Sequence, residues 1–358
     1  MFSFIPALSS LPCHVALNMP LYSLGSNACH QLSLPHADDV HSPTRTTLNL
    51  PDDEYPIKIV AGSNHTFLLT NMGGLYATGA NREGQCFMRN KDVLLGFEKV
   101  GGERRWRDCA ATWEGGVLVD EGGHVWSCGR IKNHGSLEGK GFEELFGRQG
   151  SGEMGAGDVR VAAGVQHFVI FRGHDAVGFG DGKKGQFGTT ATTTVTPEGI
   201  ILPASDLEQV ACGKDFTCIL SSTGKVSVYT TSTKHNLQAI PALPVSIKSI
   251  ASSWSTIALL DDTGKIYSWG RNDHSQAPPI ELPPIAQLSA GSEHFIALSQ
   301  DEKVYAWGWN EHGNCGLTTL EDVYTVHELK LPEDEVPVYV AGGCGTSWIW
   351  TEKRVGLT

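Results

Sequence analysis

The chain has 358 residues, of which 40% are hydrophobic and 18% are charged, and its formal net charge is −12. No run of eighteen apolar residues is present to span a bilayer, and no cluster of five or more Lys and Arg predicts a surface that follows nucleic-acid phosphates. The composition therefore argues against a membrane protein and against direct nucleic-acid binding. The 42 glycines and 17 prolines favour many turns over long helices, in two or three ordinary domains or in one large closed β-architecture.

Residues 1–18 and the cysteines of the whole chain indicate the compartment of the protein and whether it binds a metal. Residues 1–18 are mildly apolar but have no positively charged start, so we interpret them as a flexible or mis-annotated extension and not as a signal peptide or anchor. The nine cysteines are odd in number, scattered and without a C-x-x-C pair, which makes a zinc site formed by this chain alone improbable. We expect free thiols, no cofactor or metal, and a cytoplasmic and nuclear location.

A short motif recurs along the rest of the chain. It first reads PLYSLGSNACHQL at Pro20–Leu32, and it consists of a short alternating strand, usually a glycine, and then a polar loop. Six later segments follow the same pattern, beginning at Gly74, His124, Asp175, Lys225, Lys265 and Lys303.

A second motif precedes six of these copies. It reads VAGSNHTFLL from Val60 and is joined to the first motif by a hairpin such as LLTNMGGLYA, whose Asn and Gly suit a tight turn. Further copies begin at Ala110, Ala162, Ala211, Ala251 and Ser289, and a last one at Val340. Successive copies lie roughly 38 to 52 residues apart, the spacing expected of four short strands per unit.

The two motifs are out of phase at the ends of the chain. The beginning of the chain supplies a second half without a first half, and the end supplies a first half without a second. Pairing Val340–Trp350 with Leu21–Leu24 would complete a seventh unit and remove two exposed sheet edges. The sequence therefore predicts an all-β fold, a seven-bladed β-propeller formed by residues 19–358, in which strands from the two ends share one blade.

These residues carry a resemblance to a known family. The unit A-G-x-x-H, a hairpin, and then W-G-x-N-x-x-G-Q-x-G resembles the regulator-of-chromosome-condensation repeat family across residues 19–358. Within that family, Gly291–His294, Trp307–Gly316, Gly213–Phe216 and Gly342–Trp348 are similar to the fungal group of alpha-tubulin suppressor and killer-toxin-insensitivity propellers.

The resemblance implies a partner and a role. It implies a heterodimer with the small CSL-type zinc/iron protein shared by two pathways, diphthamide synthesis on elongation factor two and Elongator-dependent modification of the tRNA wobble uridine. The metal would belong to that partner. Contact with Elongator or with the diphthamide enzymes would be indirect.

The loop Trp307–Gly316 contains more polar and aromatic residues than a turn requires. Four of its residues occupy slots that recur in other copies and are expected to shape the turn: Gly308, Asn310, Gly313 and Gly316. Four others are predicted to contact a partner: Trp309, Glu311, His312 and Asn314. A tryptophan supplies a large contact area at little entropic cost. The alternative for Trp309 is that it folds back over the edge of its blade.

The loops of the A-G-x-x-H motif supply further candidates. His65, His167 and His294 are at equivalent positions, which favours an architectural role in which each is hydrogen-bonded to the backbone of the neighbouring blade. We keep His294 also as a partner-contact candidate. Because loops in a ring project to one face, residues far apart in sequence can converge there, namely Trp113, Lys214, Asp215, Trp254 and Glu293. Packing in the core is the alternative for Trp113 and Trp254.

No sequence feature predicts an enzyme. The stretch GSGEMG at residues 150–155 matches G-x-G-x-x-G but is not followed by a helical pattern, and no nucleophile shows an activating neighbour. We therefore expect a non-catalytic scaffold. The alternatives are a guanine-nucleotide exchange factor for a small GTPase and a tubulin-linked or ubiquitin-ligase adaptor.

Overall fold

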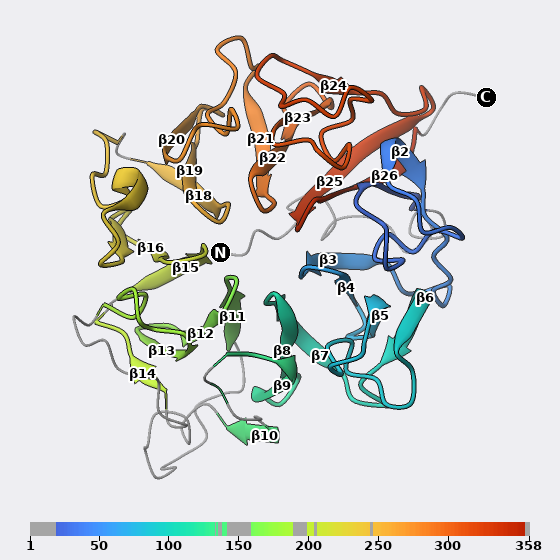
Figure 1. Ribbon diagram of the computed structural model, residues 1–358, viewed down its shortest axis with the longest axis horizontal. Coiled ribbons are helices and arrows are strands. Elements are labelled where there is room, and N and C mark those ends of the chain that lie inside the picture. Colours follow the sequence, from blue (N-terminus) through green and yellow to red (C-terminus); the bar gives the residue numbers. More distant parts are fainter. Residues whose placement is uncertain are drawn as a thin grey trace.

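The computed structural model describes residues 19–132, 134, 138–141, 159–188, 199–203, 206–243 and 246–354. The predictions made for residues 1–18 and 150–155 lie outside these ranges. The described residues form seven antiparallel sheets arranged around a central axis (Figure 1). The seven-bladed β-propeller predicted from the repeats is confirmed.

The blades are numbered here along the chain, and each is given from its innermost strand outward. Blade one comprises β3 (Pro56–Ala61), β4 (His65–Thr70), β5 (Leu75–Ala80) and β6 (Val93–Val100). Blade two comprises β7 (Trp106–Ala111), β8 (Glu114–Asp120), β9 (His124–Arg130) and β10 (Glu138–Gly141). Blade three comprises β11 (Arg160–Ala163), β12 (His167–Arg172), β13 (Asp175–Gly180) and β14 (Ile200–Ile201).

The remaining blades follow the same inside-to-outside order. Blade four comprises β15 (Leu207–Cys212), β16 (Thr217–Ser221) and β17 (Val226–Tyr229), with the short 3₁₀ helix η3 (Lys234–Asn236) after it. Blade five comprises β18 (Ile247–Ser252), β19 (Thr256–Asp261) and β20 (Ile266–Gly270). Blade six comprises β21 (Ile285–Ala290), β22 (His294–Ser299), β23 (Val304–Gly308) and β24 (Glu328–Leu329). Blade seven comprises β25 (Glu335–Gly343), β26 (Thr346–Lys353), β1 (Leu21–Gly25) and β2 (Val40–Arg45).

Blade seven closes the ring with strands from both ends of the chain. β1 pairs antiparallel with β26, and Tyr22 lies opposite Ile349 and Ser23 opposite Trp348. Trp348 and Trp350 are fully buried in this blade. The predicted pairing of the two ends is confirmed.

Two blades depart from the expected four strands. Among the described residues, blades four and five have three strands each. After β20, at the place where a fourth strand would run, the chain carries Pro278, Pro279, Pro283 and Pro284. Proline has no backbone N–H to donate to a strand ladder, so this segment follows the blade as a loop.

Side chains on the innermost strands join neighbouring blades through hydrogen bonds and an ion pair. The Gln287 amide bridges to the backbone of Val340 in both directions, accepting from its N–H (3.1 Å) and donating to its carbonyl (3.4 Å). Asp108 accepts a hydrogen bond from the backbone N–H of Val161 (2.9 Å) and forms an ion pair with Lys58 (2.6 Å). These links run from blade six to seven, from two to three, and from one to two, so they fix the blades laterally.

No helix in these described segments is both long and apolar enough to cross a bilayer.

Candidate functional site

Two sets of loops emerge at one face of the ring. Successive strands are antiparallel, so the loops from first to second strands and those after third strands leave each blade at the same end. We call this end the loop face. Backbone bonds join its loops sideways, as Lys214 N–H donates to Trp254 O and Trp254 N–H donates to Ser292 O, both at 2.8 Å. The loops of blades four, five and six are therefore held as one surface.

Trp113 and Trp254 meet across the axis of the ring. They belong to blades two and five, and their ring centroids lie 5.3 Å apart. Both line the axial channel, which has a volume of about 320 Å³ and is walled by the innermost strands. Both side chains are half-buried. They pack against each other and still present part of their surface, so packing and partner contact are compatible for these two residues.

Half of the predicted contact residues gather around one hollow on the loop face. This hollow has a volume of about 250 Å³ and lies between blades four, five and six. We call it the loop-face hollow. The predicted residues that line it are Lys214, Asp215, Trp254, Glu293 and Trp309. The structure thus brings together side chains that are up to 95 positions apart in the sequence (309 − 214).

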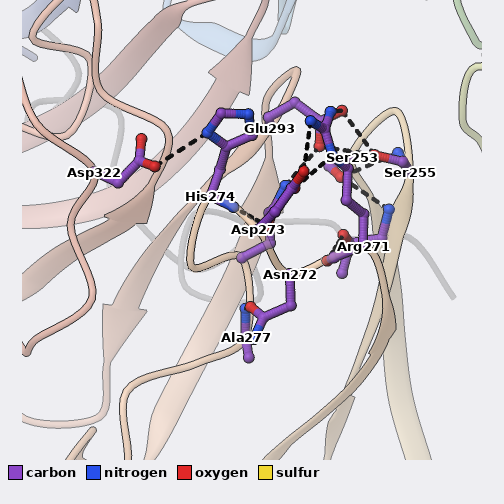
Figure 2. A network of polar contacts seen from close by, with 11 residues as sticks. Ser253, Ser255, Arg271, Asn272, Asp273, His274, Ala277, Glu293 and Asp322 are labelled. Atoms are coloured by element: carbon purple, nitrogen blue, oxygen red, sulfur yellow. Dashed lines mark hydrogen bonds and ion pairs between the residues drawn. The ribbon is translucent and has the colours of Figure 1, made fainter. Parts of the chain in front are cut away.

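A buried carboxylate, that of Glu293, lines the loop-face hollow and lies in a network of polar contacts (Figure 2). Glu293 is 7% exposed and accepts hydrogen bonds from Ser255 Oγ (2.7 Å) and Gln276 Nε2 (2.9 Å). Arg271 Nη1 lies 3.2 Å from the same carboxylate, and Arg271 Nη2 donates to Asp273 (2.8 Å). The charge of Glu293 is thereby compensated inside the protein, so this residue shapes the hollow and is not a free anion in it.

The repeated turn residues in the loop Trp307–Gly316 are structural, as predicted. Gly308, Gly313 and Gly316 have φ values of 104°, 75° and 85°, a region that side chains with a Cβ rarely adopt. Asn310 Oδ1 accepts the backbone N–H of Cys315 (2.8 Å) and closes the loop.

The prediction that Asn314 contacts a partner is wrong. Its side chain is fully buried, and Nδ2 donates to the backbone carbonyl of Trp309 (2.6 Å). The backbone carbonyl of Asn314 accepts from Ser347 Oγ (2.7 Å), which joins the loop to blade seven. Asn314 therefore holds the loop in shape from inside.

His294 is also buried and does not reach the surface. It is fully buried, and its Nε2 lies 3.0 Å from Ser347 Oγ in the next blade. His167 repeats this arrangement with Nε2 3.1 Å from Thr217 Oγ1. Burial lowers the pKa of both histidines, and that of His65, to about 4. A contact from the repeated histidine to the neighbouring blade is confirmed for His167 and His294, whereas both ring nitrogens of the buried His65 have no hydrogen-bond partner among the described residues, and a partner contact by His294 is excluded.

The remaining three candidates lie at the rim. Trp309 is half-buried, and its ring meets that of His312 edge to face at 5.3 Å. His312 Nδ1 lies 2.6 Å from Asp39 Oδ2, a hydrogen bond that joins this loop to the one between β1 and β2. Glu311 is exposed. Glu311 is thus accessible, and Trp309 and His312 are partly accessible and contact each other.

Sequence reasoning missed several nitrogen-bearing side chains of the loop-face hollow. Arg271, Lys234 and His274 line it beside the predicted residues. For Arg271 a signal was present, because it follows Trp269-Gly270 just as Trp309 follows Trp307-Gly308. Reading both residues as occupants of one repeat slot would have placed them on the same face.

The described part of the chain shows no prepared metal site, and burial suppresses the reactivity of several of its thiols. No group of three or more His, Cys, Asp or Glu side chains there is arranged to hold a metal ion. Burial raises the pKa of the Cys109, Cys128 and Cys212 thiols to about 12, which keeps them protonated at neutral pH.

Comparison with known proteins relates the chain to one repeat family. The model of the regulator of chromosome condensation (RCC1) repeat matches residues 57–85, 247–276 and 285–314, and a second model of the same repeat matches residues 301–349. The RCC1 repeat-containing protein C10F6.04 of Schizosaccharomyces pombe is 34% identical over 369 residues, which cover 93% of this chain and 99% of that protein. The secretion-regulating guanine nucleotide exchange factor of Mus musculus is 26% identical over 77% of this chain and 65% of its own length.

Solved structures agree on the fold. Prp20p from Saccharomyces cerevisiae superimposes with a TM-score of 0.80 at 19% identity, over 99% of this chain and 97% of that one. Human WBSCR16 gives a TM-score of 0.77 at 18% identity, over 94% of this chain and all of that one. At such identities the likeness concerns the fold alone.

Proposed function

Because the chain belongs to the regulator of chromosome condensation (RCC1) repeat family, we propose that it is a non-catalytic propeller that binds a small protein through its loop face. The partner we propose is the small CSL-type zinc/iron protein. In this role the propeller supports diphthamide synthesis on elongation factor two and Elongator-dependent modification of the tRNA wobble uridine, in the cytoplasm and nucleus.

The observation that carries the proposal is the convergence of accessible side chains on one rigid surface. Trp254 and Trp309 line the same hollow although they belong to different blades, and lateral backbone bonds hold their loops. Aromatic side chains at the centre of a well-held patch are the residues that most often dominate protein–protein binding energy. The loop face therefore offers a preorganised binding surface.

A double variant at the rim tests the proposed surface. Trp309→Ala combined with Glu311→Lys is expected to raise the Kd for the CSL-type protein at least about 100-fold, because it removes an aromatic anchor and reverses a neighbouring charge. Isothermal titration with the two purified proteins measures this.

The matched control lies on hairpins at the opposite end of the blades. Met72→Ala with Asp262→Lys removes an exposed apolar side chain and reverses an exposed carboxylate, and it should change the Kd less than threefold. If the double variant Trp309→Ala/Glu311→Lys binds within a few-fold of the unchanged protein, the site assignment is wrong.

A second candidate function is guanine-nucleotide exchange on a small GTPase. The similarity to the mouse secretion-regulating exchange factor favours it. Stopped-flow release of a fluorescent GDP analogue from candidate GTPases separates the two functions. The scaffold proposal expects no acceleration at micromolar propeller, whereas release accelerated tenfold or more would favour exchange activity.

A further inference from the structure

The loop-face hollow carries unpaired positive charge on an otherwise acidic chain. Lys214 and Lys234 line it with exposed side chains, and neither makes an ion pair within the described ranges. Arg271 is already compensated by Glu293 and Asp273. Asp215 also lines the hollow, and Arg271 offsets the charge of only one of its two carboxylate neighbours, so Lys214 and Lys234 are distinguished by their lack of an ion pair and not by a net positive charge of the hollow.

His235 lies among groups of both charges. It lies in η3 on the wall of the hollow, and its pKa is lowered first by burial and then by Lys234 and Arg271. Glu293 and Asp273 act in the opposite direction without reversing the shift. The charges around His235 are thus mixed, and the attraction of the hollow for an anion rests on its two lysines, which make no ion pair within the described ranges.

Apolar surface lies directly beside the lysines. The half-buried indoles of Trp254 and Trp309 line the same hollow, and the buried side chains of Phe216 and Leu237 form its deeper wall. A volume of about 250 Å³ is below the range typical of sites for whole small molecules, and it suits one or two side chains of a polypeptide.

We propose that the loop-face hollow binds a segment of the partner protein that carries an aromatic side chain next to one or more carboxylates. The aromatic ring lies against the Trp254 and Trp309 indoles, and the carboxylates pair with Lys214 and Lys234. The identity of this partner as the CSL-type protein rests on the proposed function above, whereas the chemistry of the segment follows from the hollow alone. The lysines, whose charge is not already compensated, select an acidic segment over a basic one.

Charge reversal in the hollow, matched by charge reversal elsewhere, tests this. The test variant is Lys214→Glu/Lys234→Glu. The control, Lys99→Glu/Lys225→Glu, alters two exposed lysines, on β6 and on the β16–β17 turn, away from the loop face. Binding is measured to two ligands: the purified CSL-type protein, by isothermal titration, and the labelled peptide acetyl-Asp-Glu-Phe-Asp-Glu-amide, by fluorescence anisotropy.

The expected result is a Kd at least tenfold higher for both ligands with the test variant and within twofold of the unchanged protein with the control. The peptide acetyl-Lys-Lys-Phe-Lys-Lys-amide should bind the unchanged protein at least tenfold more weakly than the acidic peptide. Equal increases in Kd for the test and control variants, or equal Kd values for the acidic and basic peptides, would overturn the proposal.

The two ligands distinguish failure of this inference from failure of the proposed function. If the CSL-type protein does not bind the unchanged propeller, but the acidic peptide binds it and has a higher Kd for the test variant than for the control, the assigned partner is wrong. The proposal that the hollow binds an acidic aromatic segment is then upheld. If the CSL-type protein binds the unchanged propeller and the test variant alike, the scaffold function stands and the hollow is not its contact.

Discussion

Trp348→Ala is expected to lower the free energy of unfolding by about 3–5 kcal/mol, the range for a large aromatic side chain deleted from a packed core. Trp348 is fully buried on β26, and it packs in one cluster with Leu21 of β1 and Ile59 of β3. Its strand neighbour Ser23 comes from the other end of the chain. The substitution therefore leaves a cavity at the point where the two ends of the polypeptide close the ring.

Guanidinium denaturation measures this effect through the midpoint at constant m value. Tyr324→Ala is the control, because that aromatic side chain is 74% exposed and its removal should cost within about 0.5 kcal/mol. A loss below about 1 kcal/mol for Trp348→Ala would mean that blade seven opens independently of the other blades.

The fold was largely predictable because the repeat itself encodes it. Each copy supplies its own strands and turn, and the phase shift between Pro20–Leu32 and the last copy from Val340 specifies which strands must meet. The number of strands per blade was predicted less well. A fourth strand is the outermost and least buried, so its presence depends on local residues, such as Pro278 and Pro279, more than on the repeat.

The candidate site was predictable as a face but not side chain by side chain. Because equivalent loops of a ring share one end, Trp113 and Trp254 could be placed on one face without a structure. Whether a loop side chain turns inward or outward depends on neighbours that are distant in the sequence. Asn314 is held by its own loop and the next blade, and the Asp39–His312 pair joins residues 273 positions apart. No local pattern reports such contacts.

Acidification from pH 7.5 to 5.5 is expected to cost about 3–4 kcal/mol of stability through the three repeated histidines. Burial holds the folded-state pKa of His65, His167 and His294 at about 4, compared with about 6.5 for an unfolded chain. As the pH falls below 6.5, the unfolded chain takes up protons that the folded protein does not. This contribution to stability is therefore fully present above pH 6.5 and is lost progressively toward pH 4, at about 1 kcal/mol per histidine by pH 5.5.

Single glutamine variants isolate this effect from other titrating groups. In His294→Gln the side-chain amide can still donate to Ser347, so the blade junction keeps a polar link without a titrating ring. The loss of unfolding free energy between pH 7.5 and 5.5, measured by denaturation at each pH, should be smaller than in the unchanged protein by about 1 kcal/mol. His36→Gln, at a side chain that is 44% exposed, should leave that loss unchanged within about 0.3 kcal/mol. An equal pH dependence for His294→Gln and the unchanged protein would show that the junction histidine gains its proton while the propeller is folded, and the repeated histidine would then not be held neutral by the packing of neighbouring blades.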